Sequence, residues 1–135
     1  MTLEHIGIWT NNPEELKGFY VDYFNGISNT KYVNKEKHFE SYFISFGSGA
    51  RIEIMRKPGI RDNTGNPGPM QHIGLAHIAF SLDTREEVDN KALQLQKKGI
   101  KILEGPRVTG DGYYEFVTLD PDGNRIEVTT KYSRN

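Results

Sequence analysis

Apolar and polar residues alternate in two stretches that resemble each other, one at the start of the chain and one past its middle. The stretches are LEHIGIW at residues 3–9 and LAHIAFSL at residues 75–82, and each has a histidine at its third position. Alternation of this kind is typical of a strand with one buried face. Because His77 follows His5 by 72 of the 135 residues, the pattern predicts two related modules.

A second repeated segment places two glutamates in matching positions. RIEI at residues 51–54 contains Glu53, and RIEV at residues 125–128 contains Glu127, 74 residues later. Each glutamate lies between two aliphatic residues, so its side chain is expected on the face of the strand that does not pack on the core. The chain therefore repeats one histidine and one glutamate in each half.

Each half is also predicted to contain one helix after its first strand. Asn12, followed by a proline, is typical of a helix start, and Gly26 of its end. In the second half Thr84 and Glu87 match a capping box, and Gly99 closes the helix. The buried faces are predicted to carry Leu16, Phe19, Tyr20, Tyr23 and Phe24 in the first helix, and Val88, Ala92 and Leu95 in the second.

The remaining alternating runs predict eight strands in all. They are residues 3–9, 30–33, 41–46 and 50–55 in the first half, and 75–82, 100–103, 113–119 and 125–129 in the second. The order predicts an α+β fold in which two tandem βαβββ modules form curved mixed sheets around a central cleft. We expect one domain, with module one at 1–57, a linker rich in proline and glycine at 58–74, and module two at 75–131.

Composition narrows the function classes without naming one. The net charge is −1, so neither a nucleic-acid partner nor a membrane partner is expected. The absence of cysteine excludes disulfides and thiolate metal sites and is compatible with a reducing compartment. No signal peptide or transmembrane span is predicted, and we expect a cytoplasmic protein.

The repeated histidines and glutamates are the candidate metal ligands. Two imidazoles and two carboxylates, from His5, Glu53, His77 and Glu127, suit one divalent ion. Ni²⁺, Zn²⁺, Co²⁺ and Mn²⁺ are the ions expected, with Fe²⁺ less favoured. If the two sheets curve toward each other, the four side chains converge on one concave surface. Four protein ligands leave room for water or substrate, which is typical of a catalytic site. Retention of these residues by gene duplication alone is the alternative interpretation.

Four further residues are weaker candidates for substrate binding. Trp9 shares a strand face with His5, and Arg107, Tyr113 and Tyr114 flank a glycine-containing turn. The two tyrosines could equally pack in the core or against a second copy of the chain. The remaining histidines, His38 and His72, have no counterpart at the repeat offset and are interpreted as surface or loop residues.

These features together resemble the vicinal oxygen chelate superfamily, which includes glyoxalase I. The resemblance rests on the paired βαβββ modules, the His, Glu, His, Glu set and the closing segment DPDGNRIEV at residues 120–128. It covers nearly the whole chain. Within the superfamily, FESYFISF at residues 39–46 and GDGYYE at residues 110–115 are similar to segments of a small bacterial glyoxalase-like group.

The resemblance implies a function and a site. Glyoxalase I of the bacterial type carries the same four ligands, so we expect a metal-dependent lyase or isomerase of the lactoylglutathione lyase type. Its reaction would be a proton shift next to a carbonyl of a small chelating substrate. Glu127 and Glu53 are the catalytic candidates, and Glu127 is the stronger of the two. The family also implies a homodimer, which a concentration-independent monomer in ultracentrifugation would refute.

Two other functions stay open at this point. The superfamily includes metal-free proteins that bind a drug or metabolite, and Trp9 could form the floor of such a pocket. It also includes Fe-dependent dioxygenases with two histidines and one glutamate, in which case Glu53 would not bind the metal directly. Fold alone does not decide among these functions.

Overall fold

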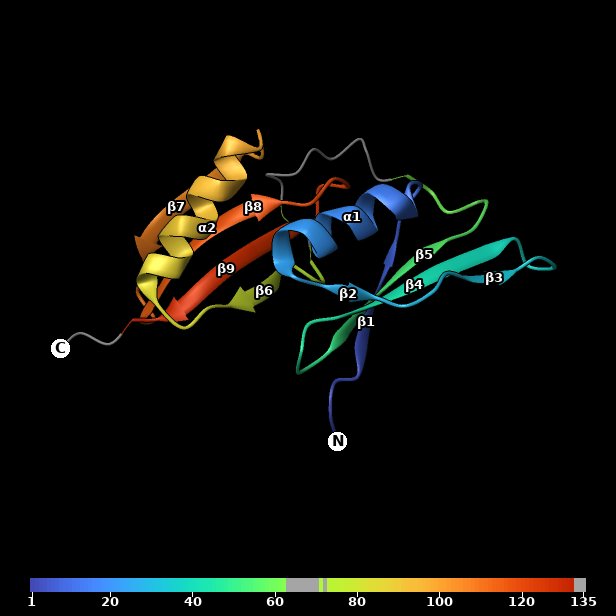
Figure 1. Ribbon diagram of the computed structural model, residues 1–135, viewed down its shortest axis with the longest axis horizontal. Coiled ribbons are helices and arrows are strands. Elements are labelled where there is room, and N and C mark those ends of the chain that lie inside the picture. Colours follow the sequence, from blue (N-terminus) through green and yellow to red (C-terminus); the bar gives the residue numbers. More distant parts are fainter. Residues whose placement is uncertain (63–70, 72, 133–135) are drawn as a thin grey trace. The chain divides into compact units, whose positions relative to one another are not determined.

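The computed structural model describes residues 1–62, 71 and 73–132, which form two compact units, Met1–Asn63 and Thr64–Asn135 (Figure 1). The first unit contains β1 (His5–Trp9), α1 (Pro13–Phe24), β2 (Ile27–Ser28), β3 (Tyr32–Asn34), β4 (Phe39–Ser45) and β5 (Arg51–Arg56). The second contains β6 (Ile78–Ser81), α2 (Arg85–Lys97), β7 (Ile102–Val108), β8 (Tyr113–Leu119) and β9 (Arg125–Lys131). The predicted α+β fold with two βαβββ-like modules is confirmed.

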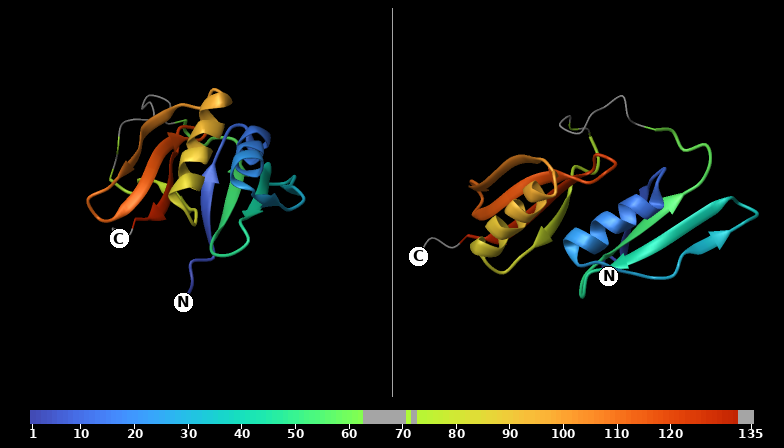
Figure 2. Two further views of the ribbon diagram at one scale, coloured as in Figure 1. Left: turned by 60° about the vertical axis from the view of Figure 1, so that its left-hand side comes forward. Right: turned by 45° about the horizontal axis from the view of Figure 1, so that its top comes forward.

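Each module folds its strands into one mixed sheet. The first sheet has the order β1-β5-β4-β2 with β3 also on β4, and the second has the order β6-β9-β8-β7. In both sheets the first strand pairs in parallel with the last, and the other pairs are antiparallel. Figure 2 shows each helix lying against one face of its own sheet. The other face of each sheet is not covered by the helix of its own module, and we refer to it as the open face.

The hydrophobic core of each module lies between the helix and the covered face of the sheet. The fully buried side chains include Leu16, Tyr20, Ile44 and Ile54 in the first module, and Val88, Leu95, Phe116 and Ile126 in the second. Side chains alternate along a strand, so the residues next to these core positions point to the open face. This alternation places Glu53 and Glu127 on the open faces, as the pattern predicted.

Helix α1 ends by a different device from the one predicted. Asn25, rather than Gly26, takes the left-handed conformation, with φ of 55°, and the Gly26 N–H donates to the Tyr20 carbonyl at 3.0 Å. A Cβ on Gly26 would lie 2.5 Å from Ile44 Cγ2, so this glycine is required by close packing.

Helix α2 begins with the predicted capping box of Thr84 and Glu87. Neither helix is long and apolar enough to cross a membrane, among the residues described.

Strand boundaries differ from the predicted ones where no neighbour is available for pairing. Leu3 and Leu75 lie outside β1 and β6 and are exposed, because the registers with β5 and β9 begin at His5 and Ile78. The described residues contain nine strands instead of eight, because the short β2 pairs with the end of β4. Within the predicted linker, residues 63–70 and 72 lie outside the described part of the chain.

The N-terminus of α1 is tied to its sheet by a carboxylate whose charge stabilises the fold. The Tyr42 hydroxyl donates to both oxygens of Glu14 at 2.8 and 2.9 Å, and Lys31 Nζ lies 2.6 Å from Glu14 Oε1. The hydrogen bond from Lys31, followed by that from Tyr42, holds the pKa of Glu14 below its ordinary value. Stability that depends on ionised Glu14 is therefore present at neutral pH and lost as the pH falls through that lowered pKa.

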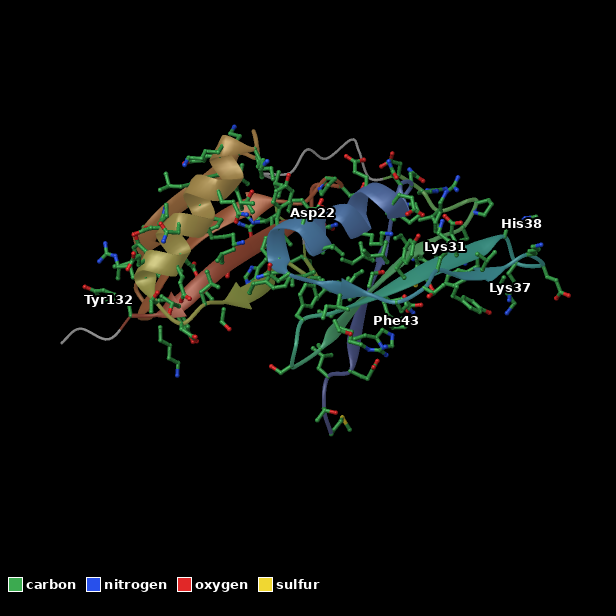
Figure 3. All side chains as sticks on the ribbon, viewed as in Figure 1. Asp22, Lys31, Lys37, His38, Phe43 and Tyr132 are labelled. Atoms are coloured by element: carbon green, nitrogen blue, oxygen red, sulfur yellow. The ribbon has the colours of Figure 1, made fainter. Side chains whose placement is uncertain are left out.

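We expect the Glu14→Gln variant to be less stable than the wild type at pH 7 by about 0.5 kcal/mol, because the carboxylate is more than half exposed and its ion pair is screened. The difference in the free energy of unfolding should shrink as the pH falls below about 4. Urea denaturation between pH 3 and pH 7 measures it. Asp22→Asn, on an exposed part of the same helix (Figure 3), should show no such pH dependence. A Glu14→Gln difference that is constant with pH would contradict the assignment.

Candidate metal-binding site

The first module brings His5 and Glu53 together on its open face. His5 begins β1, Glu53 lies in β5, and the two strands are parallel neighbours, with Gly7 opposite Glu53. The distance between His5 Nε2 and Glu53 Oε2 is 3.6 Å, and the side chains are 40% and 18% exposed. Both polar atoms are thus accessible from solvent and point to the same place.

His5 is held by its neighbours in a way that leaves Nε2 available. Its Nδ1–H donates to the Glu4 carboxylate, and Arg51 Nε donates to the other Glu4 oxygen at 2.8 Å. These contacts hold the pKa of Glu4 below its ordinary value, the hydrogen bond from His5 being the largest cause. A hydrogen bond from Nδ1–H to a carboxylate is the contact that typically orients a metal-binding histidine, and it leaves Nε2 as the nitrogen directed toward Glu53.

Packing also fixes the orientation of the His5 ring. The ring lies edge-on to Phe43, with centroids 5.3 Å apart, and the Arg51 guanidinium lies 4.1 Å from the Phe43 ring centroid. Figure 3 shows Phe43 on the side of the sheet that α1 does not cover. In the strand register, Glu53 of β5 lies opposite Phe43 of β4 on one side and opposite the small Gly7 of β1 on the other.

The second module repeats this pair with closely similar geometry. His77 Nε2 lies 3.3 Å from Glu127 Oε2, and the side chains are 42% and 19% exposed. His77 directly precedes β6, and Glu127 lies in β9. The residue opposite Glu127 on β6 is the small Ala79, as Gly7 is opposite Glu53, and on β8 it is the buried Val117. Two modules thus build the same pair from equivalent positions.

A third carboxylate shares the open face of the second sheet. Glu115 lies in β8 opposite Thr129, two positions from the row that contains Glu127. Burial, and then the negative charge of Glu127, raise the pKa of Glu115 above its ordinary value. On the adjacent strand Arg107 lies opposite Glu115. The second module therefore presents a more strongly charged open face than the first.

Two arginines on the second sheet are joined by one carboxylate. Arg107 Nη2 lies 3.0 Å from Glu104 Oε2, and Arg125 Nη2 lies 3.5 Å from Glu104 Oε1. Arg107 is exposed, whereas the side chain of Arg125 is only 12% exposed. Arg107 is therefore the one with a free approach for an anionic group, and Arg125 serves mainly to hold Glu104.

The other weak candidates fall on different faces. Tyr113 is half-buried on the same side of β8 as Glu115, while Tyr114 is 5% exposed on the helix-covered side. The Tyr114 hydroxyl donates to Asp89 of α2 at 2.6 Å, which raises its pKa. Its hydroxyl is therefore committed to the helix, and it does not line the face that carries Glu127. Trp9 is 39% exposed on the open face of the first sheet.

The donor pairs fit a divalent ion. Two ligands at about 2.1 Å from one ion are separated by about 3.0 to 3.6 Å for angles between 90° and 118°. The two His–Glu distances, 3.6 and 3.3 Å, match this range and are longer than the about 2.8 Å of a charge-assisted hydrogen bond. In the part of the chain that the structure describes, no three such side chains gather closely enough to hold an ion. Each module thus brings together two candidate ligands, one histidine and one glutamate.

Several residues around these pairs were not predicted from the sequence. Glu4 and Arg51 hold His5, and Glu115 and Glu104 lie on the second open face. The sequence did indicate that Arg51 and Arg125 occupy equivalent positions, because an arginine begins the repeated RIE segment in each module. His38, interpreted as a surface or loop residue, is exposed in the turn between β3 and β4.

A fold of two tandem βαβββ modules, each with a histidine and a glutamate on its open face, defines a class of protein that includes both lyases and oxygenases. The model of the Glyoxalase/Bleomycin resistance protein/Dioxygenase superfamily matches residues 2–128. The chain therefore belongs to that superfamily, and the resemblance to it is confirmed.

Two curated relatives match different lengths of the chain. Biphenyl-2,3-diol 1,2-dioxygenase 3 of Rhodococcus globerulus is 28% identical over 128 residues, 93% of this chain and 61% of the relative. The uncharacterized protein YqjT of Bacillus subtilis is 34% identical over 59 residues, 42% of this chain and 46% of the relative. The chain spans about half to three-fifths of the length of these relatives.

Solved structures of similar fold cover nearly the whole chain. A glyoxalase family protein from Enterococcus faecalis is 26% identical, with a TM-score of 0.74 over 95% of this chain and 96% of that one. The trypanothione-dependent glyoxalase I of Leishmania major is 18% identical, with a TM-score of 0.74 over 95% and 85%. The antibiotic-binding protein TnmS3 from Streptomyces sp. CB03234 is 20% identical, with a TM-score of 0.70 over 97% and 96%. The last two likenesses concern the fold.

Proposed function

We propose that this protein is a metal-dependent lyase or isomerase that moves a proton next to a carbonyl of a small chelating substrate. The observation that carries the proposal is the repeated pair, His5 with Glu53 and His77 with Glu127, at distances of 3.6 and 3.3 Å. One pair is not a complete site for a divalent ion, which takes four to six ligands. We therefore propose that the two pairs bind the same ion, Ni²⁺, Zn²⁺, Co²⁺ or Mn²⁺.

The roles of the four residues follow from their chemistry. The histidines bind through Nε2, and Glu4 supports His5 by accepting its Nδ1–H. A bound ion would act as a Lewis acid that holds two neighbouring oxygens of the substrate and stabilises the negative charge that develops on them. Glu127 takes the proton from one carbon at its free carboxylate oxygen and returns it to the next. Glu53 has the same chemistry and is the second candidate for this role.

The open faces suit the substrate that such a reaction needs. Ala79, opposite Glu127, is a small residue, whereas the space beside Gly7, opposite Glu53, is filled by Met55, whose Cε lies 2.8 Å from where a Gly7 Cβ would be. The buried Val117 lies on the other side of Glu127 and keeps water from that flank. Arg107 is exposed and paired with Glu104, and an anionic group of the substrate would have to share it with that carboxylate. A hemithioacetal or a related α-oxygenated carbonyl adduct is the substrate class proposed.

Metal content tests the proposal directly. The wild-type protein, stripped with a chelator and reloaded with Ni²⁺, Zn²⁺, Co²⁺ or Mn²⁺, should retain about one ion per chain. The Glu53→Ala, Glu127→Ala double variant should retain none, because only two ligands remain. Elemental analysis after gel filtration measures the ratio, and Glu86→Ala, an exposed carboxylate in α2, is the control. A wild type without stoichiometric metal would refute the proposal.

A mixing experiment separates ligands that come from one chain from ligands that come from two. A variant with His5→Ala and Glu53→Ala keeps the second pair, and a variant with His77→Ala and Glu127→Ala keeps the first. Recovery of about one ion per two chains on mixing would mean that the pairs meet across two copies. No recovery, with metal retained by the wild type, would mean that they meet within one chain.

The dioxygenase function is the second candidate, supported by the 28% identity to biphenyl-2,3-diol 1,2-dioxygenase 3 over 93% of this chain. In that case His5, His77 and Glu127 would provide ligands for Fe²⁺. The test is oxygen uptake by the Fe²⁺-loaded protein with catechols. Oxygen uptake with Fe²⁺, together with no turnover of hemithioacetals by the Ni²⁺ or Zn²⁺ forms, would favour the dioxygenase.

A metal-free binding protein is the third function, and the fold likeness to the antibiotic-binding protein TnmS3 supports it. Exposed aromatic side chains on the open face of the first sheet, including Trp9, are compatible with an aromatic ligand. A wild type that retains no metal would favour this function over the other two.

A further inference from the structure

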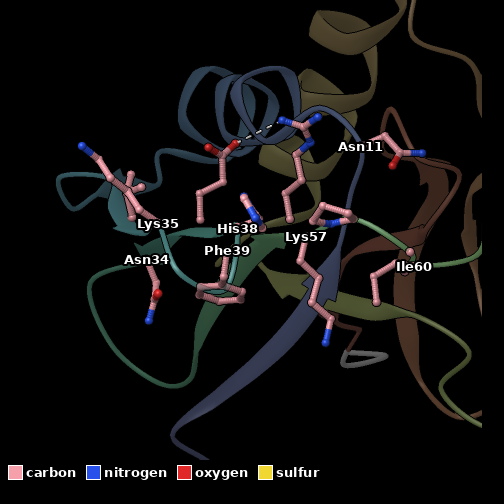
Figure 4. A pocket seen from close by; sticks show the side chains of 12 residues that line it. Asn11, Asn34, Lys35, His38, Phe39, Lys57 and Ile60 are labelled. Carbon is pink, nitrogen blue, oxygen red and sulfur yellow. Dashed lines mark ion pairs between the residues drawn. The ribbon is translucent and has the colours of Figure 1, made fainter.

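The first module contains a cavity that the His5–Glu53 pair does not line. It lies where the β3–β4 hairpin meets the chain that leaves β5, and its volume is about 560 Å³. This volume is in the range of pockets that hold small organic molecules. The lining residues are Asn11, Val33, Asn34, Lys35, His38, Phe39, Glu40, Arg56, Lys57, Pro58, Gly59 and Ile60. Figure 4 shows Phe39 between Asn34 and Lys57 in this lining.

The cavity is positively charged. Lys35, Arg56 and Lys57 line it together with one carboxylate, Glu40, so its formal charge is +2 with His38 neutral. Arg56 Nη1 lies 3.8 Å from Glu40 Oε1, the ion pair drawn in Figure 4. Glu40 is approached by Lys31 as well, at 3.6 Å, so its charge is already balanced. Lys35 and Lys57 therefore remain available to an anionic group.

One wall of the cavity is aromatic and well ordered by its neighbours. The Phe39 ring lies edge-on to Trp9, with centroids 6.3 Å apart, and is also 6.1 Å from the Tyr32 ring. Lys57 Nζ lies 5.0 Å from the centroid of the Trp9 ring, a cation–π contact that places the ammonium beside this wall. An aromatic surface and an ammonium group side by side are complementary to a flat ring that carries a negative charge.

The remaining walls of the cavity consist of two asparagine side chains, apolar residues and the end of the β3–β4 turn. Asn11 and Asn34 offer hydrogen-bonding groups, and Pro58 and Ile60 add apolar surface. His38 ends the β3–β4 turn with φ of 50°, in the left-handed region that a residue with a side chain rarely adopts. Such strain recurs at ligand-binding sites, and here it presents an imidazole to the cavity.

From these features we infer that this cavity is a binding site for a planar aromatic carboxylate. The ring packs on Phe39 beside Trp9, and the carboxylate is bound by Lys57, while Lys35 adds positive charge on the other side of Phe39. The site needs no metal and uses neither His5 nor Glu53, so it is independent of the proposed lyase function.

The test is calorimetric titration of metal-stripped full-length protein with 2-naphthoate, and with its uncharged isostere 2-naphthamide. We expect one 2-naphthoate per chain, with the amide at least about tenfold weaker because it lacks the charge that the lysines recognise. Affinity for 2-naphthoate should fall as salt is raised. Trp9 is the single tryptophan, so its one indole N–H signal in an ¹⁵N spectrum should shift with 2-naphthoate and stay in place with acetate.

Matched variants locate the binding. Lys57→Gln should weaken 2-naphthoate binding by about tenfold because a charge-assisted contact is lost, and Lys35→Gln by a smaller factor because only a more distant positive charge is lost. Lys37→Gln, in the same turn but outside the lining, should leave the affinity unchanged. Glu53→Ala should also bind normally, which distinguishes this site from the metal site.

Three results would overturn the inference. They are no measurable binding of 2-naphthoate, equal affinity for the amide, or loss of binding in Glu53→Ala with retention in Lys57→Gln. The last result would move the ligand to the His5–Glu53 pair. None of these outcomes depends on whether the metal-loaded protein is an enzyme.

Discussion

The Glu127→Gln variant is expected to lose at least about 100-fold in kcat/KM for the hemithioacetal or related adduct that we propose as the substrate of the metal-loaded protein. A positioned proton carrier contributes about 10² to 10⁴ to a rate, and the amide can neither take the proton nor return it. Glutamine keeps the size of the side chain and one oxygen ligand. Steady-state kinetics with measured metal content separates lost catalysis from lost metal.

The controls for this variant come from the same protein. Glu86→Gln, on the exposed side of α2, should keep wild-type turnover. Glu53→Gln should be impaired less than Glu127→Gln if Glu127 is the main proton carrier. Turnover of Glu127→Gln close to the wild-type value, with metal still bound, would remove Glu127 from the mechanism and leave Glu53 as the candidate.

The Gly105→Ala variant is expected to lose at least about 2 kcal/mol of its free energy of unfolding. Gly105 has φ of 80°, and a Cβ built on it would lie 2.5 Å from the Glu115 carbonyl oxygen and 3.1 Å from Phe116 Cα. Both contacts are with the backbone of the neighbouring strand, so no side chain can move aside, and the two strands must separate. Chemical denaturation measures the loss.

Gly110→Ala is the matched control for that substitution. Gly110 lies after the same strand, is not in the left-handed region, and has open space where its Cβ would be. Its substitution should change the free energy of unfolding by no more than about 0.5 kcal/mol. Equal stability of the two alanine variants would show that the β7–β8 approach is looser than the structure has it.

The proximity of each histidine to its glutamate could be predicted from the sequence because it follows from strand periodicity together with the internal repeat. Glu53 and Glu127 each lie between buried aliphatic residues, and alternation leaves them only the open face. The histidines then follow from the repeat. What the pattern could not supply is the register between parallel strands, which depends on contacts far apart in sequence. That register places Arg51 beside His5 and so supports the Glu4 contact.

The prediction that both Tyr113 and Tyr114 are candidates for substrate binding could have been more specific. Tyr113 and Tyr114 are consecutive in one strand, so they must point to opposite faces. Phe116 and Thr118 share the side of Tyr114 and are fully buried, which identifies that side as the core. Only Tyr113 was therefore ever available to the open face of the second sheet.

The cavity at the β3–β4 hairpin could not be predicted for a different reason. Its lining residues come from a turn, two loops and the ends of the three strands β3, β4 and β5, and no single periodic pattern connects these segments. His38 was judged by the absence of a counterpart in the second half. Searching for a counterpart in the other half identifies residues that both modules retained after duplication. It cannot identify a residue that gained a role in only one module.

The repetition of one histidine and one glutamate in each module has an evolutionary consequence. A single module of this kind carries two ligands, and two ligands cannot complete the coordination of a divalent ion. An unduplicated ancestor could have held such an ion only by pairing with a second copy of itself. In such an ancestor, assembly and metal capture would have been the same event, and gene fusion would have made that event independent of protein concentration if the two pairs meet within one chain.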